Sequence, residues 1–211
     1  MPLDLALLPG FLLAVALVEL TPGPNMGYLT IVASRWGRRA GLATVAGVTC
    51  GLAIYMLAAV AGLGAIVMRI AWLYAILQWA GVGFLLWLAF EAWAGGREPR
   101  AGHQPEPPAA ERLFARGLIA NLLNPKAAVF YVVLLPGFTN PARGDPVGQA
   151  LTLGAIHIAV SIVVHTLIVL TAGSVRAARW KTAGFRRRLD QAVVGGLVLT
   201  ALWLAWETIR S

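Results

Sequence analysis

Six long apolar stretches dominate the pattern of hydrophobic and polar positions along the chain. Each is long enough for a membrane-spanning helix, which takes about 20 residues. Their apolar character is continuous and does not alternate with a period of two residues, which favours helices over the strands of a membrane barrel. The pattern therefore predicts an all-α integral membrane protein with six transmembrane helices, at residues 5–33, 40–66, 70–94, 113–138, 147–173 and 189–209.

Composition agrees with this class. Of the 211 residues, 59% are hydrophobic and 12% are charged, whereas a soluble domain has about 25% charged residues. The mean hydropathy is +0.75. The single cysteine, Cys50, excludes an intramolecular disulfide, a dithiol redox relay and a cysteine-based metal site.

The basic residues are distributed unevenly between the two ends of the predicted helices. The net charge is +8, and 13 of the 17 Lys and Arg residues fall after the first, third and fifth stretches, against three on the opposite side. By the positive-inside rule, the basic loops lie in the cytoplasm and both termini lie outside it, as in a multi-pass protein of a bacterial inner (cell) membrane. The excess charge thus reports topology and contact with anionic membrane lipid, and requires no nucleic acid.

A segment rich in Pro, Gly and charge divides the chain at residues 95–112. Such a composition predicts a flexible cytoplasmic linker. The linker separates a three-helix repeat at 1–94 from a second at 113–211, which together form one membrane domain. Because each half has an odd number of spans, homologous halves would be inverted-topology repeats.

Helix-breaking motifs interrupt the first and the fourth stretch near their centres. The first contains Thr21-Pro-Gly-Pro-Asn25 and the fourth contains Asn121-Leu-Leu-Asn-Pro-Lys126. Proline removes a backbone donor and obstructs the preceding turn. Paired interruptions in matching helices of two repeats indicate a substrate site at the bilayer midplane. We therefore expect the substrate or ion to bind among Pro22, Gly23, Pro24, Asn25, Asn121, Asn124 and Pro125.

Two ionisable residues lie at the same depth, Glu19 before the first break and Lys126 directly after the second. A charge at mid-bilayer is costly and calls for a partner. One hypothesis is that the two approach each other, with Lys126 attracting a substrate carboxylate and Glu19 meeting its amino group or carrying a coupling proton. The alternative is a permanent pair that locks the first helix to the fourth.

The fifth stretch holds two histidines eight residues apart, His157 and His165. Too few further ligands lie nearby to predict a metal site. His165 is a candidate for a proton relay with Glu19, because histidine titrates near physiological pH. For His157 we favour a polar contact between helices.

In the second stretch, Gly47 and Gly51 permit close helix packing, which we place within the monomer, with a homodimer as the alternative.

At these motifs the sequence resembles the LysE/RhtB superfamily of amino-acid exporters, of the homoserine, threonine and lysine efflux type. The resemblance covers most of the first 140 residues. Its positions are TPGPN at 21–25, Gly37 to Gly41, Gly47 to Gly51, Gly81 to Leu88, Gly117 to Ala127 and Leu135 to Phe138. It implies efflux of amino acids driven by the proton-motive force, with motif residues at Pro22, Gly23, Pro24, Asn25, Asn124, Pro125 and Lys126.

Together these features predict a secondary transporter that exports amino acids or close derivatives, coupled to proton entry. We expect no enzymatic activity, no catalytic residue, no cofactor and no metal, and we find no phosphate-binding loop for ATP. Two alternatives remain: an accessory or structural membrane protein, and a six-helix membrane redox carrier or enzyme. The single cysteine disfavours the latter.

Overall fold

The computed structural model describes residues 3–21, 23–62, 71–95, 107–179 and 183–210. Every regular element in these ranges is helical. The α-helices are α1 (Leu8–Leu20), α2 (Pro24–Trp36), α3 (Arg38–Val60), α5 (Ala71–Gly95), α6 (Ala110–Leu122), α7 (Pro125–Val129), α8 (Pro146–Arg179) and α9 (Ala183–Arg210). A π-helix, η1 (Phe130–Leu134), and two 3-10 helices, η2 (Leu135–Phe138) and η3 (Pro141–Arg143), connect α7 to α8.

These helices follow the six predicted stretches in order, with differences at several ends. α8 continues to Arg179, six residues beyond the predicted end at 173. α6 begins at Ala110, inside the segment expected to be a linker, and residues 96–106 of that segment lie outside the described residues. α9 begins at Ala183, so Arg186, Arg187 and Arg188 belong to its first turns and not to the loop before it. Helical hydrogen bonds continue beyond the apolar stretch because they do not depend on an apolar environment. Hydropathy alone therefore predicts helices that are too short at these ends.

Several helices in the described residues are apolar enough for a membrane. α3 and the Pro146–Ser174 part of α8 are each long enough to cross it alone, and α6 with Pro125–Phe138 forms a third candidate that is bent by 57°. Two shorter apolar helices lie at Leu8–Leu20 and Gln78–Phe90. The described residues therefore form an all-helical structure with apolar helices typical of a membrane protein and one bent helix pair.

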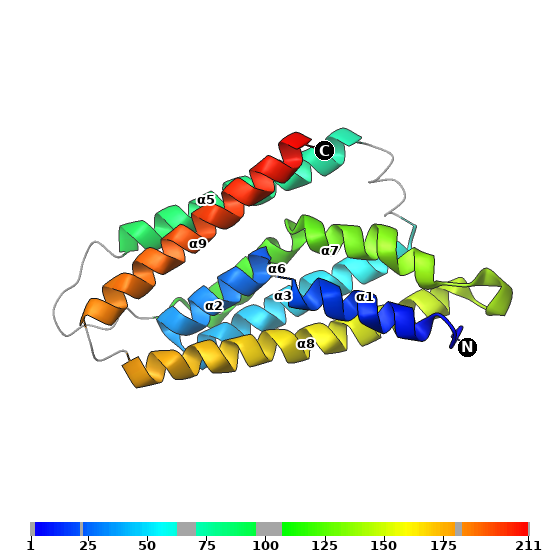
Figure 1. Ribbon diagram of the computed structural model, residues 1–211, viewed down its shortest axis with the longest axis horizontal. Helices are drawn as coiled ribbons and strands as arrows, with labels where there is room; N and C mark the ends of the chain where they lie inside the picture. Colours follow the sequence, from blue (N-terminus) through cyan, green and yellow to red (C-terminus); the bar gives the residue numbers. More distant parts are fainter. Residues whose placement is uncertain (1–2, 22, 63–70, 96–106, 180–182, 211) are drawn as a thin grey trace.

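The helices run mostly along the long axis of the molecule (Figure 1). α5 and α9 pack against each other and contact the rest of the bundle through α2 and α7. α8 packs against α1, α2 and α3, while α3 also packs along α6. The breaks after α1 and after α6 consequently lie in the middle of the molecule, enclosed by α3 and α8.

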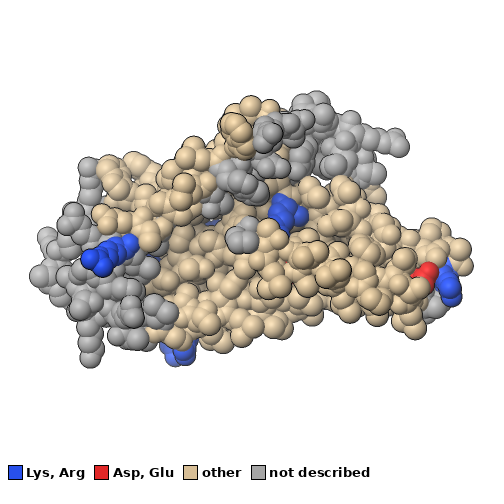
Figure 2. Space-filling model, viewed as in Figure 1, with Lys and Arg blue, Asp and Glu red and all other residues tan. Residues whose placement is uncertain are grey.

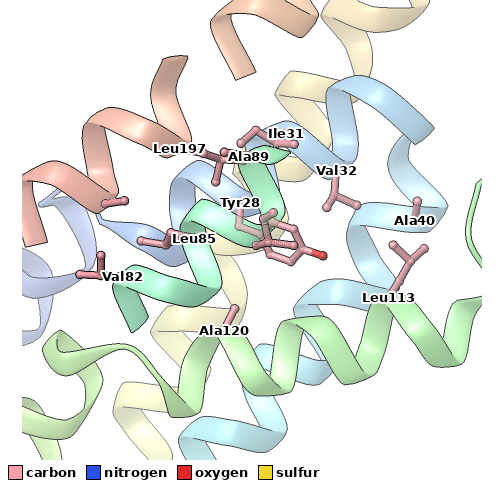
Figure 3. Close-up of a cluster of buried hydrophobic side chains, with 12 residues drawn as sticks. Tyr28, Ile31, Val32, Ala40, Val82, Leu85, Ala89, Leu113, Ala120 and Leu197 are labelled. Carbon is pink, nitrogen blue, oxygen red and sulfur yellow. The ribbon is translucent and has the colours of Figure 1, made fainter. Parts of the chain in front are cut away.

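Three apolar cores hold the described part of this arrangement, the smallest of them formed by Leu29, Ala33, Val45 and Val169. The first joins α2, α5, α6 and α9 through residues that include Tyr28, Val32, Leu85, Leu113 and Leu197 (Figure 3). The second joins α1, α3, η1 and α8 and comprises Phe11, Val15, Leu52, Ala127, Phe130, Tyr131, Leu135 and Leu153. The second core lies beside the breaks and fixes the side chains described below.

Glycines bring α3 and α6 into close backbone contact. A Cβ atom on Gly47 would overlap the carbonyl oxygen of Phe114, and one on Gly117 would overlap the carbonyl oxygen of Thr44. A Cβ on Gly51 would lie 2.6 Å from Asn121 Nδ2. This confirms the prediction that Gly47 and Gly51 serve packing within the monomer.

Large apolar side chains cover the outer surface. Leu13, Phe90 and Leu199 are 62%, 63% and 68% exposed. Over the described residues, the face in Figure 2 is almost uncharged, with charged side chains mainly at its ends and a basic patch near its middle. Such a surface is unfavourable in water and suits the hydrocarbon core of a bilayer.

Candidate functional site

The first break separates α1 from α2 by a short extended segment. Thr21 has ψ 122°, and Gly23 has φ −160° and ψ 177°. No side chain caps the start of α2. The carbonyl oxygen of Thr21 instead accepts a hydrogen bond of 2.7 Å from Lys126 Nζ. Pro22, predicted to contribute to the site, lies outside the described residues.

The second break separates α6 from α7 and is capped by its own sequence. Asn124 is extended, with φ −88° and ψ 105°, and its Oδ1 accepts a hydrogen bond of 3.1 Å from the Lys126 backbone N–H. The hydroxyl of Tyr55 on α3 donates to the carbonyl oxygen of Leu122 at 2.6 Å. The helix after this break widens into the π-helix η1, a distortion that is frequent at functional sites.

The two breaks contact each other across the molecule. Asn25 Nδ2 donates to Asn121 Oδ1 at 2.8 Å, and the Lys126 side chain passes over Gly23, where a Cβ would lie 3.6 Å from Lys126 Cδ. Both asparagines are buried. Asn25 Oδ1 and Asn121 Nδ2 have no hydrogen-bond partner among the described residues, which is uncommon for buried amides and typical of a site that binds a ligand.

Glu19 is buried, with 6% of its surface exposed, at the end of α1. Its Oε1 lies 3.1 Å from His157 Nε2 and its Oε2 lies 3.7 Å from His165 Nε2. Both histidines come from α8, so one carboxylate faces two imidazoles.

Glu19 and Lys126, which we predicted to approach each other, form no direct ion pair among the described residues. Both residues line one pocket, but the structure places the two imidazoles within 4 Å of the carboxylate and directs Lys126 Nζ to the Thr21 carbonyl. Lys126 turns to this carbonyl because the first break leaves the Thr21 oxygen without a helical donor. The long lysine side chain can reach it and donate a hydrogen bond.

Each imidazole also has a hydroxyl on its second nitrogen. His157 Nδ1 lies 2.9 Å from the Tyr131 hydroxyl, and His165 Nδ1 lies 3.1 Å from Ser161 Oγ. An ionised carboxylate only accepts hydrogen bonds, so with Glu19 ionised His157 Nε2 carries a hydrogen. Nδ1 of the neutral ring then accepts from the Tyr131 hydroxyl, which fixes the tautomer.

A pocket enclosing about 360 Å³ of empty space, part of it open to the outside, joins these groups. It is lined by Val18, Glu19, Gly23, Asn25, Met26, Leu52, Asn121, Asn124, Lys126, Ala127, Phe130, His157 and His165. The structure thus brings together most of the predicted site residues. Pro24 and Pro125 are the first residues of α2 and α7 and are not among the lining residues.

α8 and η1 contribute more side chains to the site than the sequence indicated. His157 makes the expected polar contacts between helices, to α1 and η1, but it also lines the pocket. Tyr131 and Ser161 were not singled out. A usable signal existed for Ser161, because His157, Ser161 and His165 recur every four residues on one face of an otherwise apolar helix.

Among the described residues, no group of three or more His, Cys, Asp or Glu side chains has the geometry of a metal site. The arrangement instead offers hydrogen bonds and charge: a buried carboxylate, a lysine ammonium, two imidazoles and two half-paired amides. Charged groups of both signs on opposite walls of a small pocket suit a zwitterion.

Comparison with known proteins agrees with this chemistry. The profile of the family described as "LysE type translocator" matches residues 16–208. The chain belongs to this family. The LysE family comprises membrane transporters, which confirms the prediction of a membrane amino-acid efflux transporter and of a chain that is not an enzyme.

Named relatives of this LysE-family chain include two efflux proteins. A homoserine/homoserine lactone efflux protein of Salmonella typhimurium is 33% identical over 156 residues, which cover 74% of this chain and 75% of the relative. A threonine efflux protein of Escherichia coli K12 is 29% identical over 163 residues, covering 74% and 76%. An uncharacterized membrane protein of Vibrio cholerae is 28% identical over 162 residues, covering 77% and 78%. No solved structure matches the chain.

Proposed function

We propose that this protein exports small amino acids or close derivatives from the cytoplasm, in exchange for protons, through the pocket between its two helix breaks. The observation that supports this best is that Glu19 and Lys126, which carry opposite charges, line one pocket where α1 and α6 end. An amino acid carries the complementary charges on its ammonium and carboxylate groups. Homoserine and threonine, named in the relatives' descriptions, are the first substrates to test.

In this proposal the substrate ammonium binds Glu19 and the substrate carboxylate binds Lys126. The start of α2 adds to the carboxylate side, because Gly23 caps it without a side chain and Asn25 and Met26 line the pocket. The N-terminus of a 13-residue helix favours an anion through its free amides and its dipole. The unpaired amide atoms of Asn25 and Asn121 supply further hydrogen bonds to polar atoms of the substrate.

We further propose six transmembrane spans arranged as two inverted repeats in an inner membrane, with both termini outside the cytoplasm. The broken pair α1 and α2 would be the first span, and α6 with α7 its counterpart in the second repeat. The meeting of the two breaks at one pocket and the 13-to-3 asymmetry of basic residues support this topology. Access would alternate as one repeat rocks against the other around the pocket.

Proton coupling would use Glu19, with His165 as a relay for the proton. Both are buried and face each other at 3.7 Å. In an antiporter the proton and the substrate must compete for one site, and a carboxylate that can meet either an imidazolium or an ammonium ion supplies that competition.

Transport by the purified full-length protein in lipid vesicles tests this function. Vesicles loaded with labelled L-homoserine or L-threonine should release it faster when a proton gradient is imposed, and Glu19→Gln should remove this dependence on the gradient. Glu111→Gln is the matched control, because Glu111 is an exposed glutamate at the start of α6, outside the pocket. Gradient-independent flux, or none across a broad panel of amino acids, would favour an accessory or enzymatic protein.

A further inference from the structure

The two imidazoles at Glu19 occupy different environments. His157 Nε2 is within hydrogen-bond distance of the carboxylate, at 3.1 Å, whereas His165 Nε2 is at 3.7 Å. The His157 ring also stacks on Phe130, with ring centroids 3.8 Å apart and planes inclined by 25°. Tyr131 contacts the same ring edge-on, at a centroid distance of 5.2 Å. His157 is therefore held on both nitrogens and on a face.

These contacts can hold the ring in its protonated form as well as in its neutral form. Glu19 supplies the negative charge next to Nε2, and the π face of Phe130 attracts a cation. The Tyr131 hydroxyl donates to Nδ1 of the neutral ring and can rotate to accept from a protonated Nδ1 at the same distance. The ring can thus gain a proton without any movement of heavy atoms.

Resting on the function proposed above, we propose that His157 is the residue that binds the coupling proton, and that Glu19 exchanges protonated His157 for the ammonium group of the substrate. Tyr131 acts as a positioning residue, which selects the tautomer and accepts the added hydrogen.

The exchange balances in charge. With His157 neutral, Glu19 holds one uncompensated negative charge and binds the substrate ammonium. When a proton from the outer solution reaches His157 Nδ1, the imidazolium neutralises that charge, and the ammonium loses its counter-ion and leaves to the outside. When the pocket faces the cytoplasm, the proton leaves Nδ1 and the carboxylate can bind the next ammonium. One proton enters for each substrate that leaves.

The charged and titratable groups around His157, among the described residues, come from four elements. Glu19 comes from α1, Lys126 from α7, Tyr131 from η1 and His165 from α8 itself. Lys126 lines the same pocket and repels a second positive charge. This limits the two histidines to one added proton in total, which His157 takes because of its shorter contact with Glu19.

Substrate counterflow separates proton binding from substrate movement, because exchange of internal for external substrate needs no net proton transfer. We would compare His157→Gln, His165→Gln and the parent protein in vesicles with labelled L-homoserine. Glutamine keeps a neutral donor near Glu19. In His157→Gln, the ratio of gradient-driven accumulation to counterflow should fall about tenfold or more, because the variant cannot bind the coupling proton. His165→Gln should retain more of the gradient-driven accumulation than His157→Gln.

Tyr131→Phe supplies a second measurement, the pH dependence of transport, which would not change if Tyr131 only supported the fold. This change keeps the aromatic ring and removes the hydroxyl at Nδ1, so the pH at half-maximal gradient-driven transport should shift. Full gradient-driven accumulation by His157→Gln, or loss of its counterflow along with accumulation, would overturn the assignment to His157. An unshifted pH profile in Tyr131→Phe would overturn the role of Tyr131. Absence of flux in the parent would instead contradict the function proposed above.

Discussion

The two helix breaks resemble each other in sequence but are stabilised in different ways. At the second, Asn124 caps α7 with its own side chain, and Tyr55 binds the last carbonyl group of α6. At the first, no side chain caps α2, and the Thr21 carbonyl depends on Lys126, which is 105 residues away in sequence. The second break thus has a local cap and one contact from α3, whereas the first has no cap of its own and depends on Lys126.

This difference bears on transport. An interruption stabilised by its own residues can stay intact while the two halves move, but one stabilised from the opposite half must change when they separate. In this structure Lys126 and the pair of Asn25 and Asn121 are the polar links between the breaks. We therefore expect the first break to rearrange during the transport cycle and the second to act as a fixed reference.

Replacing Lys126 should have the largest effect. Lys126→Met removes both the charge opposite Glu19 and the donor to the Thr21 carbonyl, so transport should fall by a factor on the order of 100. The Thr21 carbonyl also loses its donor, which should lower the free energy of unfolding by about 0.5–1.5 kcal/mol. Initial rates in vesicles and thermal unfolding in detergent measure the two effects.

Lys126→Arg is the matched control, because it keeps the charge and a donor and should retain part of the transport. Normal transport by Lys126→Met would show that the first break does not depend on the second half.

The next largest effect is expected from variants that push α3 away from α6, because the contact between these helices supports the second break. Gly47→Ala places a methyl group against the Phe114 backbone and should destabilise the protein by about 1–3 kcal/mol. Gly83→Ala on α5 is the control, since a Cβ there meets nothing within 4 Å, and it should change the stability by about 1 kcal/mol or less. Equal melting temperatures of the two variants would contradict the close contact of α3 and α6.

Asparagine substitutions at the two breaks test the comparison directly. Asn25→Ala removes the partner of a fully buried Asn121 side chain, which should cost about 1–3 kcal/mol. Asn124→Ala removes a cap within its own turn, which should cost about 1 kcal/mol. Thermal unfolding of both variants ranks them, and a larger loss in Asn124→Ala would reverse our view of which break depends on distant contacts.

The smallest effect is expected at the N-terminus, where Asp4 ties the chain before α1 to the connection between η2 and α8. The Asn140 side chain donates to Asp4 Oδ2 at 2.9 Å, and Arg143 lies 3.8 Å away. These contacts, with the Asn140 hydrogen bond first, hold the pKa of Asp4 below its ordinary value of 3.8.

A lowered pKa means that this stabilisation is present above pH 3.8 and is lost as the pH falls through the folded-state pKa. Asp4→Asn should therefore melt slightly below the parent near neutral pH and together with it at strongly acidic pH. A difference that persists in acid would assign the effect to packing and not to the charge.

The sequence alone determined the features that act through a residue's own backbone or polarity. Continuous apolar stretches predicted the helices, and Pro24 and Pro125 marked both breaks, because a missing amide hydrogen interrupts a helix whatever surrounds it. Glu19 and Lys126 could likewise be placed at the site, since the cost of a charge in a membrane depends on depth.

The tertiary structure decided which side chains meet. Glu19 could have met Lys126 or a histidine, and the choice depends on how α8 is rotated against α1 and on the unpaired Thr21 carbonyl that engages Lys126. Asn124 and Asn121 look alike in the sequence, yet one caps its own helix and the other binds Asn25. Apart from the Asn124 cap, these pairings join residues that lie 96 or more positions apart along the chain, and no local pattern in the sequence encodes them.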